Sequence, residues 1–355
     1  MKTKLFLSLA AGLLALGVYP ALADPPLGAS RVFATVPAVP GFPEGIAVRD
    51  NRVYVTGPAS FGIFTPSAVW AYNLQTGALV HTFPITLQDP SPAVMKGLSP
   101  GNFGPDGRLY CPEPFMGVVI RLNLNAANTQ SVYAGPFPAP GGPGTSLLNE
   151  LVFDDDGFLY VTDSFQATIF RVPPGGGAPV VWFTDPRLAG DPFVPFGVNG
   201  IRIDKENKGL YVSVTAENGT LNGVIYRLRL KNHPTAADMQ EFHRYPFPDP
   251  APGALPGPDG IAFGRSGKLY VALAGTSQIS VLRPDGTEEA RYSGPAANPS
   301  GSPNPMPWVN PANIAFNNDD EALLFTNHAS LIMPPDPSLF SVIEVFVDDK
   351  GQPVP

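Results

Sequence analysis

Residues 149–162 read Asn-Glu-Leu-Val-Phe-Asp-Asp-Asp-Gly-Phe-Leu-Tyr-Val-Thr, and this stretch decides the fold. A short apolar strand leads into a polar turn that ends in Gly157, and an aromatic-rich strand follows. The chain continues with Thr168–Val172, a Gly-rich turn at 175–177 and the run Pro179–Phe183. Four short strands joined by tight turns are typical of one blade of a β-propeller.

The same pattern recurs six times along the chain, with a period of roughly 50 residues. The copies open at Glu44, Ser99, Asn149, Asn199, Asp259 and Asn313, and their second strands contain 53–55, 109–111, 159–161, 210–212, 269–271 and 324–326. Pro and Gly fall at the joints between strands, where they do not interrupt a hydrogen-bonded ladder. We therefore predict an all-β fold, a six-bladed β-propeller that forms a single domain over residues 24–355.

The last copy lacks one strand, and the N-terminal part of the chain has one strand to spare. The last copy stops after three strands, near Ser341–Val347, whereas Arg31–Thr35 precedes the first copy without a blade of its own. We predict that this N-terminal strand closes the last blade, which removes an exposed sheet edge.

The first 23 residues have the pattern of an export signal. Lys2 and Lys4 precede an apolar run from 5 to 18, and Ala21-Leu22-Ala23 offers a small-residue cleavage site before Asp24. We predict a signal peptide over 1–23, cleavage near Ala23–Asp24, and a secreted or periplasmic mature protein. No later apolar run is long enough to span a membrane, so we expect no membrane association after cleavage.

The net charge and the cysteine content exclude some classes of partner and any intrachain disulfide. The formal charge of −8 becomes −10 once Lys2 and Lys4 are removed, which argues against binding to nucleic acid. Cys111 is the only cysteine, so no intrachain disulfide can form. We expect a monomer that binds a small-molecule substrate.

The residues that open the six copies are candidates for a metal site. In a propeller the first strand of each blade lines the central channel, so these polar residues are expected to project into it at one depth. Their carboxylate and amide oxygens, with two formal negative charges, suit one Ca²⁺ ion. Asn-Gly and Asp-Gly are also common turn dipeptides, as at Asp106-Gly107 and Asp285-Gly286, so each residue taken alone is open to a purely structural interpretation.

With these motifs the mature chain resembles the family of senescence marker protein 30 (SMP-30), gluconolactonase and luciferin-regenerating enzyme, with diisopropyl fluorophosphatase and the paraoxonases as more distant relatives. The stretch Gly257–Ala262 is the most similar part. The resemblance implies a channel calcium ion held by Glu44, Asn149, Asn199 and Asp259. The chain departs from the family pattern in two places: Gly follows Glu44 where Pro and an aromatic residue are usual, and Glu150 stands where Asp is commoner.

A calcium ion in the channel would support hydrolysis of a small lactone, ester or phosphoester, because it polarises the oxygen of the reacting group. Asp259 is the predicted catalytic residue, as general base or as nucleophile. Glu150 is a second candidate, with the role of an ordinary structural carboxylate as its alternative.

Two other functions stay open at this point. Similar repeats occur in NHL-type propellers, so one alternative is a non-catalytic extracellular binding protein; the other is a propeller lyase or a strictosidine-synthase-like enzyme. The loops before the ring positions carry five aromatic residues that are candidates for an apolar wall around a ligand or for loop packing: Phe137, Phe193, Phe196, Phe247 and Trp308. The four histidines, at 81, 233, 243 and 328, lack zinc-site spacing, and we expect a structural role for His328, away from the channel or at a blade edge.

Overall fold

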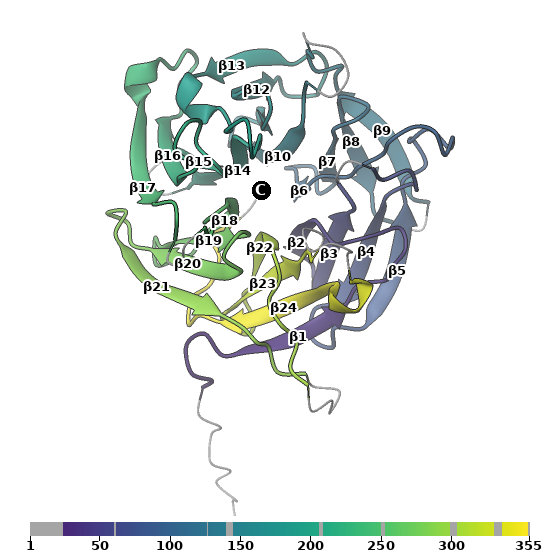
Figure 1. The fold of residues 1–355 in the computed structure, drawn as a ribbon. Helices are drawn as coiled ribbons and strands as arrows, with labels where there is room; N and C mark the ends of the chain where they lie inside the picture. Colours follow the sequence, from purple (N-terminus) through teal and green to yellow (C-terminus); the bar gives the residue numbers. More distant parts are fainter. Residues whose placement is uncertain are drawn as a thin grey trace, which may run out of the picture.

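The protein is a closed ring of six four-stranded antiparallel sheets, as the computed structural model shows (Figure 1). The structure describes residues 24–59, 62–125, 127–139, 145–205, 209–249, 253–298, 304–329 and 336–353. The predicted six-bladed β-propeller is confirmed. The predicted signal peptide, 1–23, lies outside the described residues.

Each of the first five blades contains four strands that follow one another in the chain, from the innermost outward. Blade 1 has β2 (Gly45–Arg49), β3 (Arg52–Gly57), β4 (Ala68–Asn73) and β5 (Leu79–Pro84), and blade 2 has β6 (Asn102–Phe103), β7 (Leu109–Glu113), β8 (Val118–Asn123) and β9 (Thr129–Ala134). Blade 3 has β10 (Leu148–Phe153), β11 (Leu159–Asp163), β12 (Thr168–Val172) and β13 (Val180–Thr184), and blade 4 has β14 (Val198–Asp204), β15 (Gly209–Val214), β16 (Gly223–Arg229) and β17 (Met239–Tyr245). Blade 5 has β18 (Pro258–Phe263), β19 (Leu269–Leu273), β20 (Gln278–Leu282) and β21 (Glu288–Ser293).

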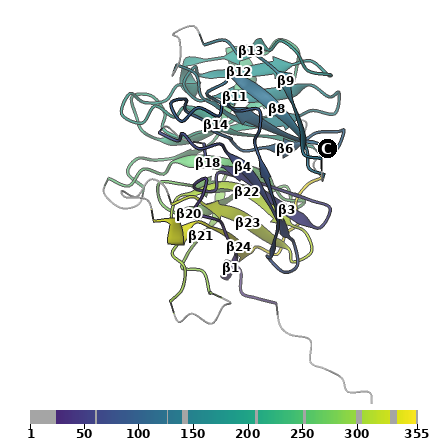
Figure 2. The ribbon, with the colours of Figure 1, turned by 90° about the vertical axis from the view of Figure 1, so that its right-hand side faces the viewer.

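Blade 6 joins the two ends of the chain. It contains β22 (Pro311–Asn317), β23 (Ala322–Asn327), β24 (Ser341–Phe346) and, as its outermost strand, β1 (Ser30–Thr35). β1 pairs antiparallel with β24, with Arg31 opposite Glu344 and Val32 opposite Ile343, and the two strands lie side by side in Figure 1. The predicted closure by the N-terminal strand is therefore confirmed. Figure 2 shows the ring from the side, with β13 and β1 at opposite edges.

A repeated aromatic contact joins neighbouring blades. The tyrosine of a blade's second strand packs edge-on against the phenylalanine near the end of the next blade's first strand. The ring centroids are 5.3 Å apart for Tyr54–Phe103, 4.8 Å for Tyr110–Phe153, 4.9 Å for Tyr211–Phe263 and 5.3 Å for Tyr270–Phe316. Such edge-to-face pairs contribute about 0.5–1.5 kcal/mol each beyond their burial. In four of the six copies, the aromatic second strand thus packs its blade against the next one.

Helical structure in the described residues is limited to three single-turn 3-10 helices, Pro186–Leu188, Ala236–Asp238 and Pro337–Leu339. Within that part of the chain, none of them has the length or the apolar character of a membrane-spanning helix.

Candidate metal and active site

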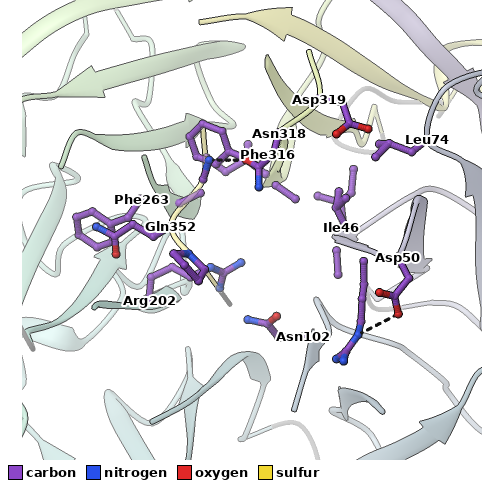
Figure 3. A pocket seen from close by; sticks show the side chains of 18 of the residues that line it. Ile46, Asp50, Leu74, Asn102, Arg202, Phe263, Phe316, Asn318, Asp319 and Gln352 are labelled. Atoms are coloured by element: carbon purple, nitrogen blue, oxygen red, sulfur yellow. Dashed lines mark hydrogen bonds and ion pairs between the residues drawn. The ribbon is translucent and has the colours of Figure 1, made fainter. Parts of the chain in front are cut away.

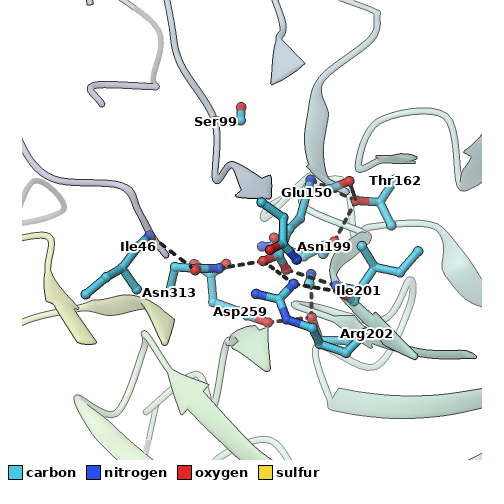
Figure 4. A network of polar contacts seen from close by, with 12 residues as sticks. Ile46, Ser99, Glu150, Thr162, Asn199, Ile201, Arg202, Asp259 and Asn313 are labelled. Carbon is cyan, nitrogen blue, oxygen red and sulfur yellow. Dashed lines mark hydrogen bonds and ion pairs between the residues drawn. The ribbon is translucent and has the colours of Figure 1, made fainter. Parts of the chain in front are cut away.

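A cavity of about 110 Å³ lies at one mouth of the channel, where the first strands of the blades begin. Five of the six ring residues predicted from the sequence line it: Glu44, Ser99, Asn149, Asn199 and Asp259. Most of them are buried, with Asn199 only 4% exposed. Figure 4 shows Asn199 on β14, Asp259 on β18 and Ser99 on the segment that leads into β6, around this point. The sequence repeat therefore brings oxygen donors from five different blades to one place.

The sixth ring residue was predicted wrongly by one position. In blades 3 to 6 the register of the innermost pair shifts within four residues, which marks a β-bulge, between Leu148 and Leu151 in blade 3 and between Pro311 and Ile314 in blade 6. Counted from this bulge, Ala312 and not Asn313 corresponds to Asn149. Accordingly Ala312 lines the cavity, whereas Asn313 corresponds to Glu150 and bonds to it.

The glycine that follows a ring residue is required by the neighbouring blade and not by a turn. A Cβ atom on Gly200 would lie 2.3 Å from the backbone oxygen of Asp259, and one on Gly260 would lie 2.6 Å from Asn313 Nδ2. Both glycines sit inside bulged first strands. The Asn-Gly and Asp-Gly dipeptides of the ring thus differ from turn dipeptides, because they let adjacent first strands approach closely.

Hydroxyl groups orient the two ring amides. Asn149 Nδ2 donates to Ser164 Oγ at 3.0 Å, and Asn199 Nδ2 donates to Thr215 Oγ1 at 3.0 Å. Each hydroxyl in turn donates to a backbone oxygen of the next blade, so it must accept from the amide nitrogen. The amide oxygens are left for another partner. Asn199 Oδ1 is buried and has no hydrogen-bond partner in the described part of the chain.

Glu150 is surrounded by donors. Its carboxylate accepts from Arg202 Nη1 at 2.6 Å, from Ile201 N at 2.9 Å and from Asn313 Nδ2 at 2.8 Å, a network drawn in Figure 4. The side chains of Glu150 and Arg202 are 2% and 12% exposed, so this is a buried ion pair. These contacts make Glu150 an anchor between blades 3, 4 and 6; its catalytic role stays a prediction.

Asp259 carries the perturbed carboxyl group of the site. Burial raises its pKa well above the usual value, and the nearby carboxylates of Glu44 and Glu150 raise it further, against a lowering by a hydrogen bond from Asn199. Only one arginine, Arg202, is ion-paired with this group of three acids in the described residues, through Glu150. A divalent cation would relieve the remaining repulsion.

His328 also lines the cavity, so the expectation that it lies away from the channel is wrong. Its Nε2 lies 2.6 Å from Glu44 Oε2, and its ring packs 4.2 Å from the ring of Phe42, measured between centroids. His328 directly follows β23, as Ser164 follows β11 and Thr215 follows β15. When the sixth copy is aligned with Leu324 opposite Tyr160, His328 takes the position of Ser164 and Thr215. The sequence would then have predicted that His328 faces the ring.

Of the two interpretations left open for the aromatic loop residues, an apolar wall or loop packing, the structure supports the wall for one residue and packing for two. Of the five aromatic loop residues, only Phe196 lines the cavity. Phe137 and Trp308 are each 5% exposed and pack inside blades, against Phe170 and Phe325. Phe193 instead is 90% exposed. Phe247 is half-buried, and its backbone N–H donates to Asn222 Oδ1 at 2.8 Å. Loops that leave a blade fold back onto it, and a sequence does not reveal on which side an aromatic ring packs.

The donor set fits a hard cation better than a transition metal. Among the described residues no three His, Cys, Asp or Glu side chains form a metal-holding cluster, so a zinc-type site has no support there. The cavity instead combines two carboxylates, Glu44 and Asp259, with the amide oxygens of Asn149 and Asn199. A buried amide oxygen without a partner, next to a carboxyl group whose ionisation is opposed, is the arrangement that a hard cation would complete.

Comparisons with known proteins agree with this architecture. Regucalcin from Agrobacterium tumefaciens, described as a calcium-binding protein, is 16% identical with a TM-score of 0.63, covering 92% of this chain and 96% of that one. A gluconolactonase from Xanthomonas campestris is 16% identical with a TM-score of 0.53, covering 88% and 86%. A histidine-to-alanine variant of virginiamycin B lyase from Staphylococcus aureus, described as catalytically inactive, is 16% identical with a TM-score of 0.52, covering 86% and 94%. At these identities the likeness shows the fold alone.

A search of curated protein sequences gives no significant match. The model of the SMP-30/gluconolactonase/LRE-like region, however, matches residues 119–302, just over half of the 355-residue chain. That match contains Asn149, Asn199 and Asp259 of the cavity. The chain therefore belongs to the SMP-30/gluconolactonase/LRE-like family.

Proposed function

We propose that this protein is a calcium-dependent hydrolase of a small lactone, ester or phosphoester. The observation that carries the proposal is the buried, unpartnered Oδ1 of Asn199 in a cavity that also holds Glu44, Asn149 and Asp259. Family membership and the description of regucalcin as calcium-binding support a divalent metal. Glu44, Asn149, Asn199 and Asp259 would hold the ion, which when bound would polarise the carbonyl or phosphoryl oxygen of the substrate.

The chain's own groups supply the proton transfer. Asp259 is the proposed general base: it accepts a proton from the attacking water, whose oxygen bonds to the acyl carbon or phosphorus while the bond to the leaving oxygen breaks. The alternative is direct attack by the Asp259 carboxylate. Glu44 holds the imidazole of His328 at the cavity wall, so His328 is placed to pass a proton to the leaving oxygen. Glu150 and Arg202 position the first strands around this site.

The first test is calorimetric titration of Ca²⁺ into chelator-treated protein that begins at Asp24. We expect one saturable site in the wild type and loss of binding in a Glu44→Gln/Asp259→Asn double variant. Asp348→Asn, at an exposed position with φ 53° that asparagine tolerates, is the matched control and should bind normally. Absence of binding in the wild type would refute the calcium site and favour a metal-free binding propeller.

Hydrolysis is tested separately with a panel of aldonolactones, aryl esters and phosphotriesters. We expect turnover that requires Ca²⁺ and falls by about 10²-fold or more in Asp259→Asn, within the range for loss of a general base. Full activity of that variant would remove Asp259 from the chemistry.

One observation favours a second candidate, a lyase. His328 adjoins the candidate metal residues, and a histidine-to-alanine variant of the structurally similar virginiamycin B lyase is described as inactive. In this mechanism His328 would remove a proton from carbon and the carbon–oxygen bond would break without addition of water. Mass spectrometry of the products separates the two: a lyase product lacks the added water, and ¹⁸O from labelled solvent does not enter it.

Location and assembly belong to the same proposal. We propose that residues 1–23 direct export and that the mature protein is a monomer in the periplasm or outside the cell. Cell fractionation with N-terminal sequencing, and light scattering of the mature chain, test these points.

A further inference from the structure

A second, larger cavity opens at the other mouth of the channel. It has a volume of about 500 Å³, within the range of small-molecule sites. First strands of several blades line it together with the C-terminal segment Gly351–Pro353 (Figure 3). None of the proposed calcium ligands lines it.

The C-terminal segment is a fixed wall of this cavity. Gln352 N donates to Phe263 O at 2.9 Å, and the Gln352 side chain accepts from Lys205 N at 3.0 Å and donates to Asp204 at 3.1 Å. Gly351 N donates to Asn318 Oδ1 at 2.7 Å. The segment thus bonds to blades 4, 5 and 6, and its N–H groups and the Gln352 side chain are already paired.

Two residues that line the cavity carry buried donors without a partner among the described residues. Arg49 Nη1 is buried and has no hydrogen-bond partner among the described residues, although Arg49 Nε lies 3.4 Å from Asp50 Oδ2. Asn102 is 6% exposed and uses its Oδ1 to accept from Phe103 N, which leaves its Nδ2 available to a ligand. Arg202 adds a second guanidinium, which it shares with Glu150. Figure 3 places Asn102 between Asp50 and Arg202.

The acidic residues of the cavity lie at its rim. The Asp50 side chain is 86% exposed and Asp319 is exposed, so water screens both charges. The Arg49 side chain is 33% exposed, and its guanidinium lies 5.1 Å from the centroid of the Phe103 ring. An anion that enters the cavity therefore meets a partly buried guanidinium and an amide donor beyond the two carboxylates.

We propose that this cavity binds a small carboxylate-bearing molecule, anchored by the Arg49 guanidinium and the Asn102 amide. A guanidinium presents parallel N–H groups that match the two oxygens of a carboxylate. The inference does not depend on the proposed function, because the site shares no residue with the calcium cavity.

The test is calorimetric titration of succinate into the metal-free mature protein, with the neutral isostere succinamide as the ligand control. We expect saturable succinate binding, no succinamide binding, and affinity about tenfold or more lower in Arg49→Gln, in keeping with a charge-assisted hydrogen bond. Arg229→Gln, which makes the same charge change on an exposed side chain outside the cavity, should bind as the wild type does.

Asn102→Asp provides a second variant. It keeps the oxygen that accepts from Phe103 N and adds a negative charge beside Arg49, so it should abolish binding while the melting temperature stays near that of the wild type. No succinate binding by the wild type, or equal affinity in Arg49→Gln and Arg229→Gln, would overturn the proposal.

Discussion

Removing the negative charge of Asp259 should stabilise the metal-free protein and weaken metal binding. In the metal-free protein its carboxylate is buried beside Glu44 and Glu150, and both neighbours oppose its ionisation. Asp259→Asn removes one of these like charges and keeps the shape. We expect the variant, without metal at pH 7, to be more stable by roughly 1 kcal/mol, which raises Tm by about 2 °C. Thermal unfolding against Asp348→Asn measures the difference, and an unchanged or lower Tm would contradict it.

The pH dependence follows from the same group. A folded-state pKa above the unfolded value means that the folded protein binds this proton more tightly, so its contribution to stability is complete below the unfolded pKa and is lost as pH rises through the folded pKa. The metal-free wild type should therefore lose stability relative to Asp259→Asn as pH rises from about 4, the ordinary pKa of aspartate. Unfolding curves at a series of pH values test this. Saturating Ca²⁺ should abolish the trend, because the bound cation favours the ionised carboxylate.

Glu150 offers a residue-scale test of its anchoring role. Glu150→Gln removes the negative partner of Arg202, whose side chain is only 12% exposed, and leaves that cation without a counter-charge. We expect a loss of about 3 kcal/mol in the free energy of unfolding. The double variant Glu150→Gln/Arg202→Met should recover much of it, as measured by urea denaturation. A Glu150→Gln protein as stable as the wild type would show that the buried ion pair does not hold the blades.

At the scale of elements, the strand β1 protects the edge of the sixth blade. Val32 and Ala34 of β1 are 7% and 6% exposed, and β1 covers the backbone of β24. A chain that begins at Val36 loses this strand. We expect it to be less stable by about 3–5 kcal/mol and to self-associate through β24. A chain that begins at Leu27 keeps β1 and serves as control; light scattering and thermal unfolding compare the two.

The same element shows what the sequence can predict. Three strands in the last copy and one unclaimed strand at the N-terminus are enough to predict the closure, because a propeller blade needs four. The strand Thr168–Val172 was placed correctly to the residue, since a polar turn precedes it and a Gly-rich turn follows it. Repeat counting is reliable here because every copy must bury the same two faces.

The sequence was less informative where the copies diverge. In blade 6, Leu324 stands where the other blades carry tyrosine. Without this marker the sixth copy was aligned with the others one residue too far along the chain, and Asn313 was assigned to the ring in place of Ala312. The same slip concealed His328. Side-chain contacts across the ring, such as Glu150 with Arg202 and Asn313, join residues far apart in sequence, and spacing within one repeat carries no information about them.

At the scale of the whole molecule, two terminal segments close the ring. β1 fastens blade 6 at its outer edge, and the C-terminal segment fastens blades 4, 5 and 6 at the channel mouth opposite the candidate active site. Asp349, just before the C-terminal segment, strengthens this attachment: its carboxylate accepts from Tyr270 OH at 3.1 Å and from Ser266 N at 3.3 Å. Because the chain ends are tied at separate places, unfolding of either end is expected to loosen different blades.

Gly351 allows this second closure to be tested. A Cβ atom there would lie 2.8–2.9 Å from three carbon atoms of Phe316, too close for any residue but glycine without movement of the segment. We expect Gly351→Val to destabilise the protein by about 2 kcal/mol, as overpacking does, and to speed hydrogen exchange at the amides of Arg265, Gly351 and Gln352. Pro353→Ala, an exposed neighbour without this contact, is the control. If exchange at these amides stays slow while stability falls, the segment remains docked and the loss arises from strain within blade 6. If exchange becomes faster and stability also falls, the C-terminal segment is part of the closure of the ring.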